Sequence, residues 1–224
     1  MSGVLYGVGA GCGDPSEITL KAIEIIKQCA VIIFPAGSKD QCRAYDIVKD
    51  YIPENKELHF FDFPMIRDKS TLNQRREKIY ESVKEYLSSG KDTAFVTIGD
   101  PLIYSTFSYI AAFAYADGFT VRYADGIPSF LSCASLLGII LGDGNEQIHI
   151  IPGSADLREA LELPGIKIFM KLGKHISELK EILDASDHEF LGAVSHCGMP
   201  DEKIYKEISI IPNEKAYLLT AFVR

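Results

Sequence analysis

The chain has 224 residues with an apolar content of 47%, which allows a core for one large or two small domains without disulfide support. Its formal net charge of −8 argues against duplex nucleic acid as a partner, because that partner selects basic surfaces. The sequence has neither a long apolar run nor a basic leader, so we expect no membrane span and no signal peptide.

Strand-like apolar runs alternate with segments of helical periodicity along the chain. Strands are predicted at 4–8, 31–34, 58–61, 94–98, 119–121, 148–151, 166–172, 190–194 and 217–223. Helices are predicted at 18–26, 45–51, 72–87, 110–115 and 129–137, and on both sides of the 166–172 strand. The alternation predicts an α/β architecture with mainly parallel strand pairs. We expect a division near residue 115, into domains 1–115 and 116–224 with a cleft between them.

A glycine-rich run, Gly7 to Pro15, joins the first predicted strand to the first helix. Alternating glycines allow positive φ angles and let the backbone come close to a ligand. A dinucleotide-binding loop needs a third glycine or alanine, but Cys12 and Asp14 occupy the two possible positions. The second strand also ends at Phe34 without the acidic residue that this fingerprint requires. We therefore disfavour a nicotinamide-dependent oxidoreductase, while a glycine-rich turn without a ligand stays an alternative.

The run from Thr97 to Phe107 follows the fourth predicted strand in the same way. Gly99 permits a close backbone approach, and Asp100 supplies a carboxylate. Open α/β sheets bind ligands at the carboxyl ends of their strands, which favours a ligand loop here. Ser105 and Thr106 equally suit the cap of the following helix. A third turn, Asp125 to Ser129, taken alone is typical of a structural turn with a serine cap.

Together the three runs resemble the tetrapyrrole methylase family. That family is marked by a glycine-rich first loop, a Gly-Asp-Pro after the fourth strand and a Gly-Ile turn that opens the second domain. Two details are similar to the precorrin-2 and cobalt-factor II C(20)-methyltransferases: Asp14-Pro15 followed by Thr19-Leu20-Lys21-Ala22, and Tyr104-Ser105-Thr106-Phe107. Asp125 departs from the pattern, because relatives often carry Pro or Glu there.

The resemblance implies two αβα domains that bind S-adenosylmethionine in the cleft between them. Domain 1–115 would form the tetrapyrrole side, and domain 116–224 would complete the cofactor site. The implied cofactor-binding residues are Ile98, Gly99, Asp100, Ile103, Ser105, Thr106, Pro128, Ser129, Leu172 and Cys197. The implied substrate-binding residues are Gly11, Gly13, Asp14, Pro15 and Tyr104. Leu172 equally fits a plain strand core. No catalytic residue is assigned, because the sulfonium methyl is already activated and positioning supplies the catalysis.

The implied activity is methyl transfer to carbon 20 of precorrin-2 or cobalt-factor II, by a cytoplasmic homodimer that binds neither nucleic acid nor membrane. Alternatives are a sister methylase acting at another ring position, a diphthine synthase, an RNA methylase and a non-catalytic tetrapyrrole carrier. The substrate carboxylates should meet basic residues. The densest basic cluster is Arg67, Lys69, Arg75, Arg76 and Lys78, which a solvated helix face explains equally well.

The cysteines and histidines show no metal-ligand spacing. The cysteines are Cys12, Cys29, Cys42, Cys133 and Cys197. They form no Cys-x-x-Cys pair, which argues against a disulfide framework or a structural zinc site and favours reduced thiols in the cytoplasm. We expect no metal held by the protein, so that any cobalt would arrive inside the substrate.

Overall fold

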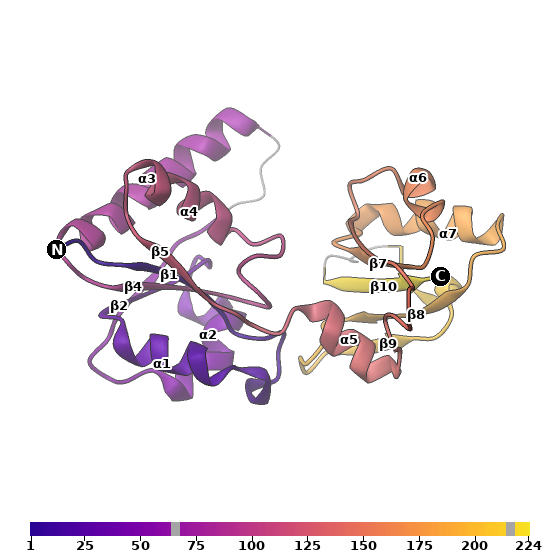
Figure 1. The fold of residues 1–224 in the computed structure, drawn as a ribbon, viewed down its shortest axis with the longest axis horizontal. Coiled ribbons are helices and arrows are strands. Elements are labelled where there is room, and N and C mark those ends of the chain that lie inside the picture. The colour runs from indigo at the N-terminus through magenta and orange to yellow at the C-terminus, as the bar shows by residue number, and fades with distance from the viewer. Residues whose placement is uncertain (64–67, 214–217) are drawn as a thin grey trace. The chain divides into compact units, whose positions relative to one another are not determined.

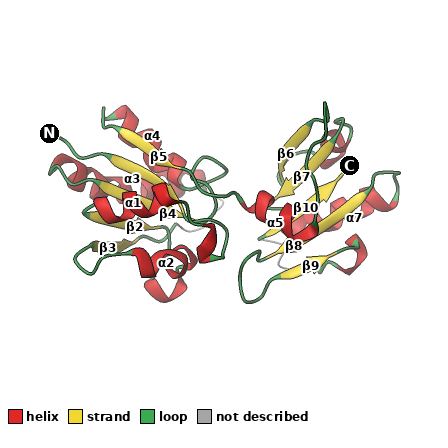
Figure 2. Ribbon diagram, turned by 60° about the horizontal axis from the view of Figure 1, so that its bottom comes forward, coloured by secondary structure: helices red, strands yellow, loops and turns green. Residues whose placement is uncertain are grey.

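The computed structural model describes residues 1–63, 68–213 and 218–224, which form two compact units, Met1–Pro128 and Ser129–Arg224. Each unit is a sheet with helices on both faces (Figures 1 and 2). The first unit extends beyond the predicted boundary near 115, because β5 (Val121–Ala124) pairs with β1 (Leu5–Gly9) in the first sheet. The structure therefore corrects the division of the chain to Pro128.

The first sheet has the strand order β3-β2-β4-β1-β5, and all its neighbouring strands are parallel. Its other strands are β2 (Val31–Phe34), β3 (Glu57–Phe60) and β4 (Thr93–Thr97). Parallel strands covered on both faces read as continuous apolar runs, which is why the sequence of β2 predicts its bounds correctly. The sheet confirms the parallel arrangement expected for this half of the chain.

Two pairs of helices cover the first sheet (Figure 1). The helices α1 (Leu20–Gln28) and α2 (Arg43–Val48) lie on one face, and α3 (Lys69–Ser88) and α4 (Phe107–Ala116) lie on the other. Alternate residues of a strand pack against opposite helix pairs. In β2, Ile32 and Phe34 pack with α1 and α2, whereas Val31 and Ile33 pack with α3 and α4. Short 3₁₀ segments occur at Pro15–Glu17, Lys39–Gln41 and Lys49–Tyr51.

The second sheet has the strand order β6-β7-β10-β8-β9 and mixed directions. Its strands are β6 (Ile148–Pro152), β7 (Ile166–Met170), β8 (Phe190–Ser195), β9 (Lys203–Tyr205) and β10 (Leu219–Val223). β6 and β7 are parallel, but β10 runs antiparallel to both β7 and β8, and β9 runs antiparallel to β8. The prediction of mainly parallel pairs is therefore wrong for this sheet, because β10 inserts in the opposite direction between two parallel strands.

Helices cover both faces of the second sheet as well (Figure 1). α6 (Leu157–Leu161) and α7 (Ile176–Asp184) pack on one face, and α5 (Ser129–Leu137) packs on the other, against β8 and β10. Further 3₁₀ segments occur at Gly173–His175 and Ile208–Ile210. Tyr217, the predicted first residue of the last strand, and Arg67 of the basic cluster lie outside the described residues. None of the helices that the structure describes has the length and apolar character of a membrane span.

Candidate functional site

The carboxyl ends of β1, β4 and β5 lie at one edge of the first sheet, because these strands are parallel neighbours. Each of the three runs that the sequence singled out begins at this edge. Gly11 to Pro15 follows β1, Ile98 to Thr106 follows β4, and Asp125 to Pro128 follows β5. In open α/β sheets ligands bind at this edge. The structure thus brings the three predicted runs together within the first unit.

Four glycines hold these loops in backbone contact, and we call Gly9, Gly11, Gly99 and Gly126 the glycine junction. The N–H of Gly99 donates to the C=O of Gly11 at 2.7 Å, and both residues have positive φ angles of 71° and 79°. A Cβ on Gly9 would lie 2.6 Å from the Cα of Gly126 and 2.6 Å from the carbonyl oxygen of Gly99. Residues without Cβ are therefore required for the three loops to meet.

The Asp100 carboxylate fastens two of the loops together. Its Oδ1 accepts from the N–H of Leu102 at 2.8 Å, and its Oδ2 accepts from the N–H of Gly126 at 2.9 Å. The residue is only 8% exposed. A carboxylate has about four acceptor positions, so these two bonds leave capacity for a ligand donor. A role of Asp100 in cofactor binding stays a prediction, but its observed contacts position the loops.

The first loop and the third turn are tied to the segment that leads into α1. Glu17 Oε2 accepts from the N–H of Cys12 at 3.0 Å. The hydroxyl of Thr19 donates to the C=O of Asp125 at 3.0 Å, and Lys21 Nζ lies 3.1 Å from Asp125 Oδ2. The exposed ion pair contributes at most about 1 kcal/mol. Glu17 is not predicted from the sequence, because no spacing rule links it to the backbone of Cys12.

Asp14, predicted to contact the substrate, is exposed at the end of the first loop. Its Oδ1 accepts from the N–H of Ser16 at 2.7 Å, and this hydrogen bond lowers the pKa of the carboxyl group. The neighbouring Gly13 is half-buried and Pro15 is exposed. Asp14 therefore presents an ionised carboxylate to solvent at neutral pH.

Of the two predicted hydroxyls before α4, only one caps the helix. Ser105 Oγ accepts from the N–H of Phe107 at 3.2 Å and donates to Thr97 Oγ1 at 3.3 Å. Thr106 is the helix N-cap residue, but its side chain makes no capping hydrogen bond. The capping interpretation thus holds for Ser105, and its hydroxyl also links the second loop to the end of β4.

Tyr104 lies in the same loop with a φ angle of 48°, which a residue with a Cβ rarely adopts. It is 41% exposed, and burial raises the pKa of its hydroxyl, which is therefore neutral at physiological pH. Ile98 and Ile103, predicted to touch the cofactor, are half-buried in this loop. Strained backbone of this kind gathers at functional sites.

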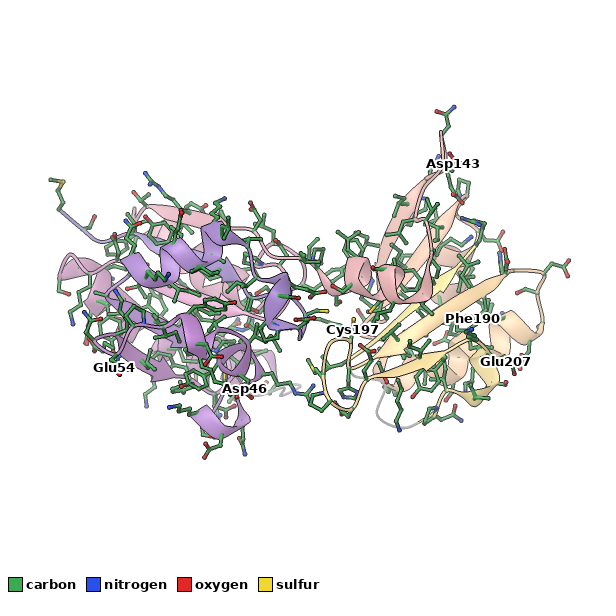
Figure 3. All side chains as sticks on the ribbon, turned by 90° about the horizontal axis from the view of Figure 1, so that it is seen from below. Asp46, Glu54, Asp143, Phe190, Cys197 and Glu207 are labelled. Carbon is green, nitrogen blue, oxygen red and sulfur yellow. The ribbon has the colours of Figure 1, made fainter. Side chains whose placement is uncertain are left out.

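The remaining predicted residues lie where the first unit ends and in the second unit. Pro128 ends the first unit and Ser129 begins α5, and both are half-buried. Leu172 follows β7, and Cys197 (labelled in Figure 3) follows β8. The Leu172 side chain is fully buried in the apolar core under α7, which favours the core interpretation of that side chain.

The basic cluster of α3 has the character of a solvated helix face. Arg75 and Lys78 are exposed, whereas the Arg76 guanidinium lies 3.3 Å from the ring centroid of Tyr109 and donates to Asn73 Oδ1 at 3.3 Å. Within residues 1–63, 68–213 and 218–224, no three His, Cys, Asp or Glu side chains gather as a metal-binding group.

The family model described as "Tetrapyrrole (Corrin/Porphyrin) Methylases" matches residues 4–209. A probable cobalt-precorrin-2 C(20)-methyltransferase of Methanocaldococcus jannaschii is 36% identical over 89% of this chain and 85% of its own length. A precorrin-2 C(20)-methyltransferase of Sinorhizobium sp is 27% identical over 95% of this chain and 88% of its own length.

The fold has a counterpart among solved structures. Uroporphyrin-III C-methyl transferase from Thermus thermophilus, complexed with S-adenyl homocysteine, matches with a TM-score of 0.72 and 18% identity. The match covers 99% of this chain and 92% of that one. At this identity the likeness supports the fold of two αβα domains, while the sequence matches establish the family. The chain belongs to the tetrapyrrole (corrin/porphyrin) methylases.

Proposed function

We propose that the protein transfers the methyl group of S-adenosylmethionine to carbon 20 of precorrin-2 or of its cobalt form. The observation that carries the proposal is the meeting of the three family-like runs at the glycine junction. The names of the relatives from Methanocaldococcus jannaschii and Sinorhizobium sp support carbon 20 as the position. They differ in whether cobalt is present, so both forms of the ring are candidate substrates.

The glycine junction suits a cofactor held by main-chain groups. Gly9 and Gly126 have no Cβ, and a methyl group at either would overlap neighbouring backbone atoms. Loops packed this closely present N–H and C=O groups in fixed positions. We infer that the cofactor-binding residues are Ile98, Gly99, Asp100, Ile103, Ser105, Thr106, Pro128, Ser129, Leu172 and Cys197. Gly11, Gly13, Asp14, Pro15 and Tyr104 would border the tetrapyrrole.

S-adenosylmethionine supplies an activated methyl group, so the protein has to align it with a ring carbon and exclude water. Positioning of this kind lowers a barrier by up to about 7–11 kcal/mol. Removal of a proton from the methylated carbon needs a base with a pKa near neutrality. Asp14 has a lowered pKa and Tyr104 a raised one, so neither group meets that condition. We therefore assign no general base.

Incubation with radiolabelled S-adenosylmethionine and each form of the substrate, followed by mass spectrometry of the ring, tests the proposal. The expected result is transfer of one labelled methyl group, which fragmentation assigns to carbon 20. Methylation elsewhere would favour a sister methylase, and tetrapyrrole binding without transfer would favour a carrier. Calorimetry with NAD, expected to show no binding, tests the oxidoreductase alternative.

Two further properties rest on the family resemblance alone. We propose a homodimer and a cytoplasmic location, as expected for a relative of these enzymes. Sedimentation equilibrium of the purified chain measures the oligomeric state, with a mass of about 50 kDa as the expected result, twice the 24.8 kDa of one chain.

A further inference from the structure

The helix α5 packs against the second sheet with one side. Phe130 and Ala134 on this side are buried. Leu137 lies against β8, because a Cβ on Gly192 would be 2.8 Å from Leu137 Cδ2. These positions follow the i, i+4, i+7 spacing of a single helix face. With about 3.6 residues per turn, Ser132 lies on the side of α5 that points away from this sheet.

Ser132 is nevertheless buried. Its exposed fraction is 7%, whereas Ser135 and Leu136, on the outward side one turn later, are exposed. The outward side of α5 is therefore enclosed at Ser132 and open further along the helix. A helical side chain leans toward the N-terminus of its helix, so the Ser132 hydroxyl lies over the turn that Ser129 begins.

The Ser132 hydroxyl makes no hydrogen bond, and within the described part of the chain its Oγ is the only buried side-chain oxygen or nitrogen without a partner. A serine inside a helix commonly donates to the C=O four residues earlier, which here belongs to Pro128, but this bond is not made. A buried hydroxyl without a partner costs free energy, and alanine is the better helix former. Neither packing nor helix formation thus explains a serine at position 132, and an unsatisfied group of this kind points to a bound molecule.

The position of Ser132 favours the cofactor as that molecule. Pro128 and Ser129, which belong to the proposed cofactor-binding residues, lie at the start of the same helix. The first N–H groups of a helix have no partner within it, so this end of α5 carries further hydrogen-bond donors. S-adenosylmethionine has acceptors in its adenosine part and a carboxylate in its methionine part. A serine hydroxyl can donate to either.

We propose that Ser132 is a cofactor-binding residue whose hydroxyl donates a hydrogen bond to S-adenosylmethionine. The inference rests on the proposed function, because that function supplies the cofactor. Serine at this position then lowers the stability of the protein without cofactor and raises its affinity for the cofactor. The acceptor lies either in the adenosine part or in the methionine part, and two probes distinguish these sources.

The experiment compares Ser132→Ala and Ser132→Cys with the matched control Ser135→Ala, an exposed serine of the same helix, in the full chain. Calorimetry with S-adenosylhomocysteine measures binding of both parts, and calorimetry with methylthioadenosine, which lacks the amino-acid group, measures binding of the adenosine part. Loss of one hydrogen bond predicts that Ser132→Ala binds S-adenosylhomocysteine about three- to tenfold more weakly. An equal loss with methylthioadenosine would place the acceptor in the adenosine part, and no loss would place it in the methionine part.

Ser132→Cys separates the hydrogen bond from the volume of the side chain. A thiol fills a similar space but is a weak donor, so this variant should also bind more weakly than the wild type. Ser135→Ala should bind as the wild type does. Unchanged affinity of Ser132→Ala for S-adenosylhomocysteine would overturn the inference, as would affinity restored by Ser132→Cys or an equal loss in Ser135→Ala.

Thermal unfolding without ligand supplies a readout that a structural hydroxyl would not give. Both alanine variants gain helix propensity, but only Ser132→Ala removes an unpaired buried hydroxyl. Its melting temperature should therefore exceed that of Ser135→Ala by about 2–4 °C. A hydroxyl bonded to an ordered water would give the opposite result, a lower melting temperature with unchanged affinity, and would overturn the inference.

The same measurements distinguish this inference from the proposed function. A wild type that binds no S-adenosylhomocysteine would overturn both. A wild type that binds this probe through Ser132 but transfers no methyl group to either form of the ring would refute the proposed function alone, and the assignment of Ser132 to cofactor binding would stand.

Discussion

Replacing Gly126 by alanine tests the glycine junction directly. The new Cβ would lie 2.1 Å from the carbonyl oxygen of Gly99, 2.7 Å from the Cα of Gly9 and 2.9 Å from its carbonyl carbon. These are backbone atoms, so no side-chain rotation relieves the clash. Overpacking of this kind costs about 1–3 kcal/mol. A shift of the Gly126 N–H away from the Asp100 carboxylate costs about 1.5–3 kcal/mol more when the bond breaks completely.

We therefore expect the free energy of unfolding to fall by about 3 kcal/mol for Gly126→Ala, between the cost of overpacking alone and the sum of both terms. Urea unfolding followed by tyrosine fluorescence is the assay. The chain has no tryptophan, and most of its eleven tyrosines, from Tyr6 to Tyr123, lie in the first unit. Calorimetry with S-adenosylhomocysteine at low temperature should show weakened binding by molecules that remain folded.

Gly37→Ala is the matched control, because the nearest atom to its new Cβ is the Cβ of Asp62 at 3.8 Å, an ordinary contact. This variant should unfold within about 0.5 kcal/mol of the wild type, as surface substitutions usually do. If Gly126→Ala is as stable as the Gly37→Ala control and binds S-adenosylhomocysteine normally, the argument for close backbone packing at the junction is refuted.

Asp100→Asn places an amide donor where two backbone N–H groups need acceptors. The substitution should therefore lower the free energy of unfolding, measured by urea unfolding, by about 1–3 kcal/mol. A variant as stable as the wild type would contradict the role of Asp100 in positioning the loops. Leu172→Ala should lower the free energy of unfolding of the second unit by about 2–5 kcal/mol, measured by thermal unfolding followed by circular dichroism. A smaller loss would mean that the Leu172 side chain does not belong to the core. Burial raises the pKa of the Cys29 thiol to about 12, so iodoacetamide at pH 8 should not modify this thiol in the native protein. Mass spectrometry measures the modification, and rapid labelling of Cys29 without urea would refute the prediction.

Local sequence patterns predicted those helices and strands whose bounds are set by nearby residues. The strand β2 and the helix α5 have the bounds that their sequences indicate. β9 escaped prediction because Lys203 and Ile204 are exposed and only Tyr205 is buried, which leaves no alternation to detect. The antiparallel insertion of β10 and the position of β5 in the first sheet depend on pairing between distant segments, which an apolar run does not specify.

In the candidate site too, the sequence predicts the loops but not the contacts between residues that are distant in the sequence. Glycines and strand ends indicated ligand loops after β1 and after β4, and the hydrogen bond from the Gly99 N–H to the Gly11 C=O joins these two loops. The hydrogen bond from the Gly126 N–H to Asp100 joins residues far apart in the sequence, so no sequence motif predicts it. Likewise, the residue type of Lys171 does not predict its positive φ angle of 56°, because lysine rarely adopts this conformation.

The place of β10 in the second sheet has a consequence for synthesis on the ribosome. The strand that lies between β7 and β8 is the last to be translated of the strands that the structure describes. Until Leu219–Val223 is available, no described strand joins β7 to β8, so each of these two strands has an unpaired edge. Domains generally fold as units during translation, so the first unit has all of its strands long before the second can close. Nascent chains stalled just short of β10 should accordingly carry a protease-resistant first unit and an open second one.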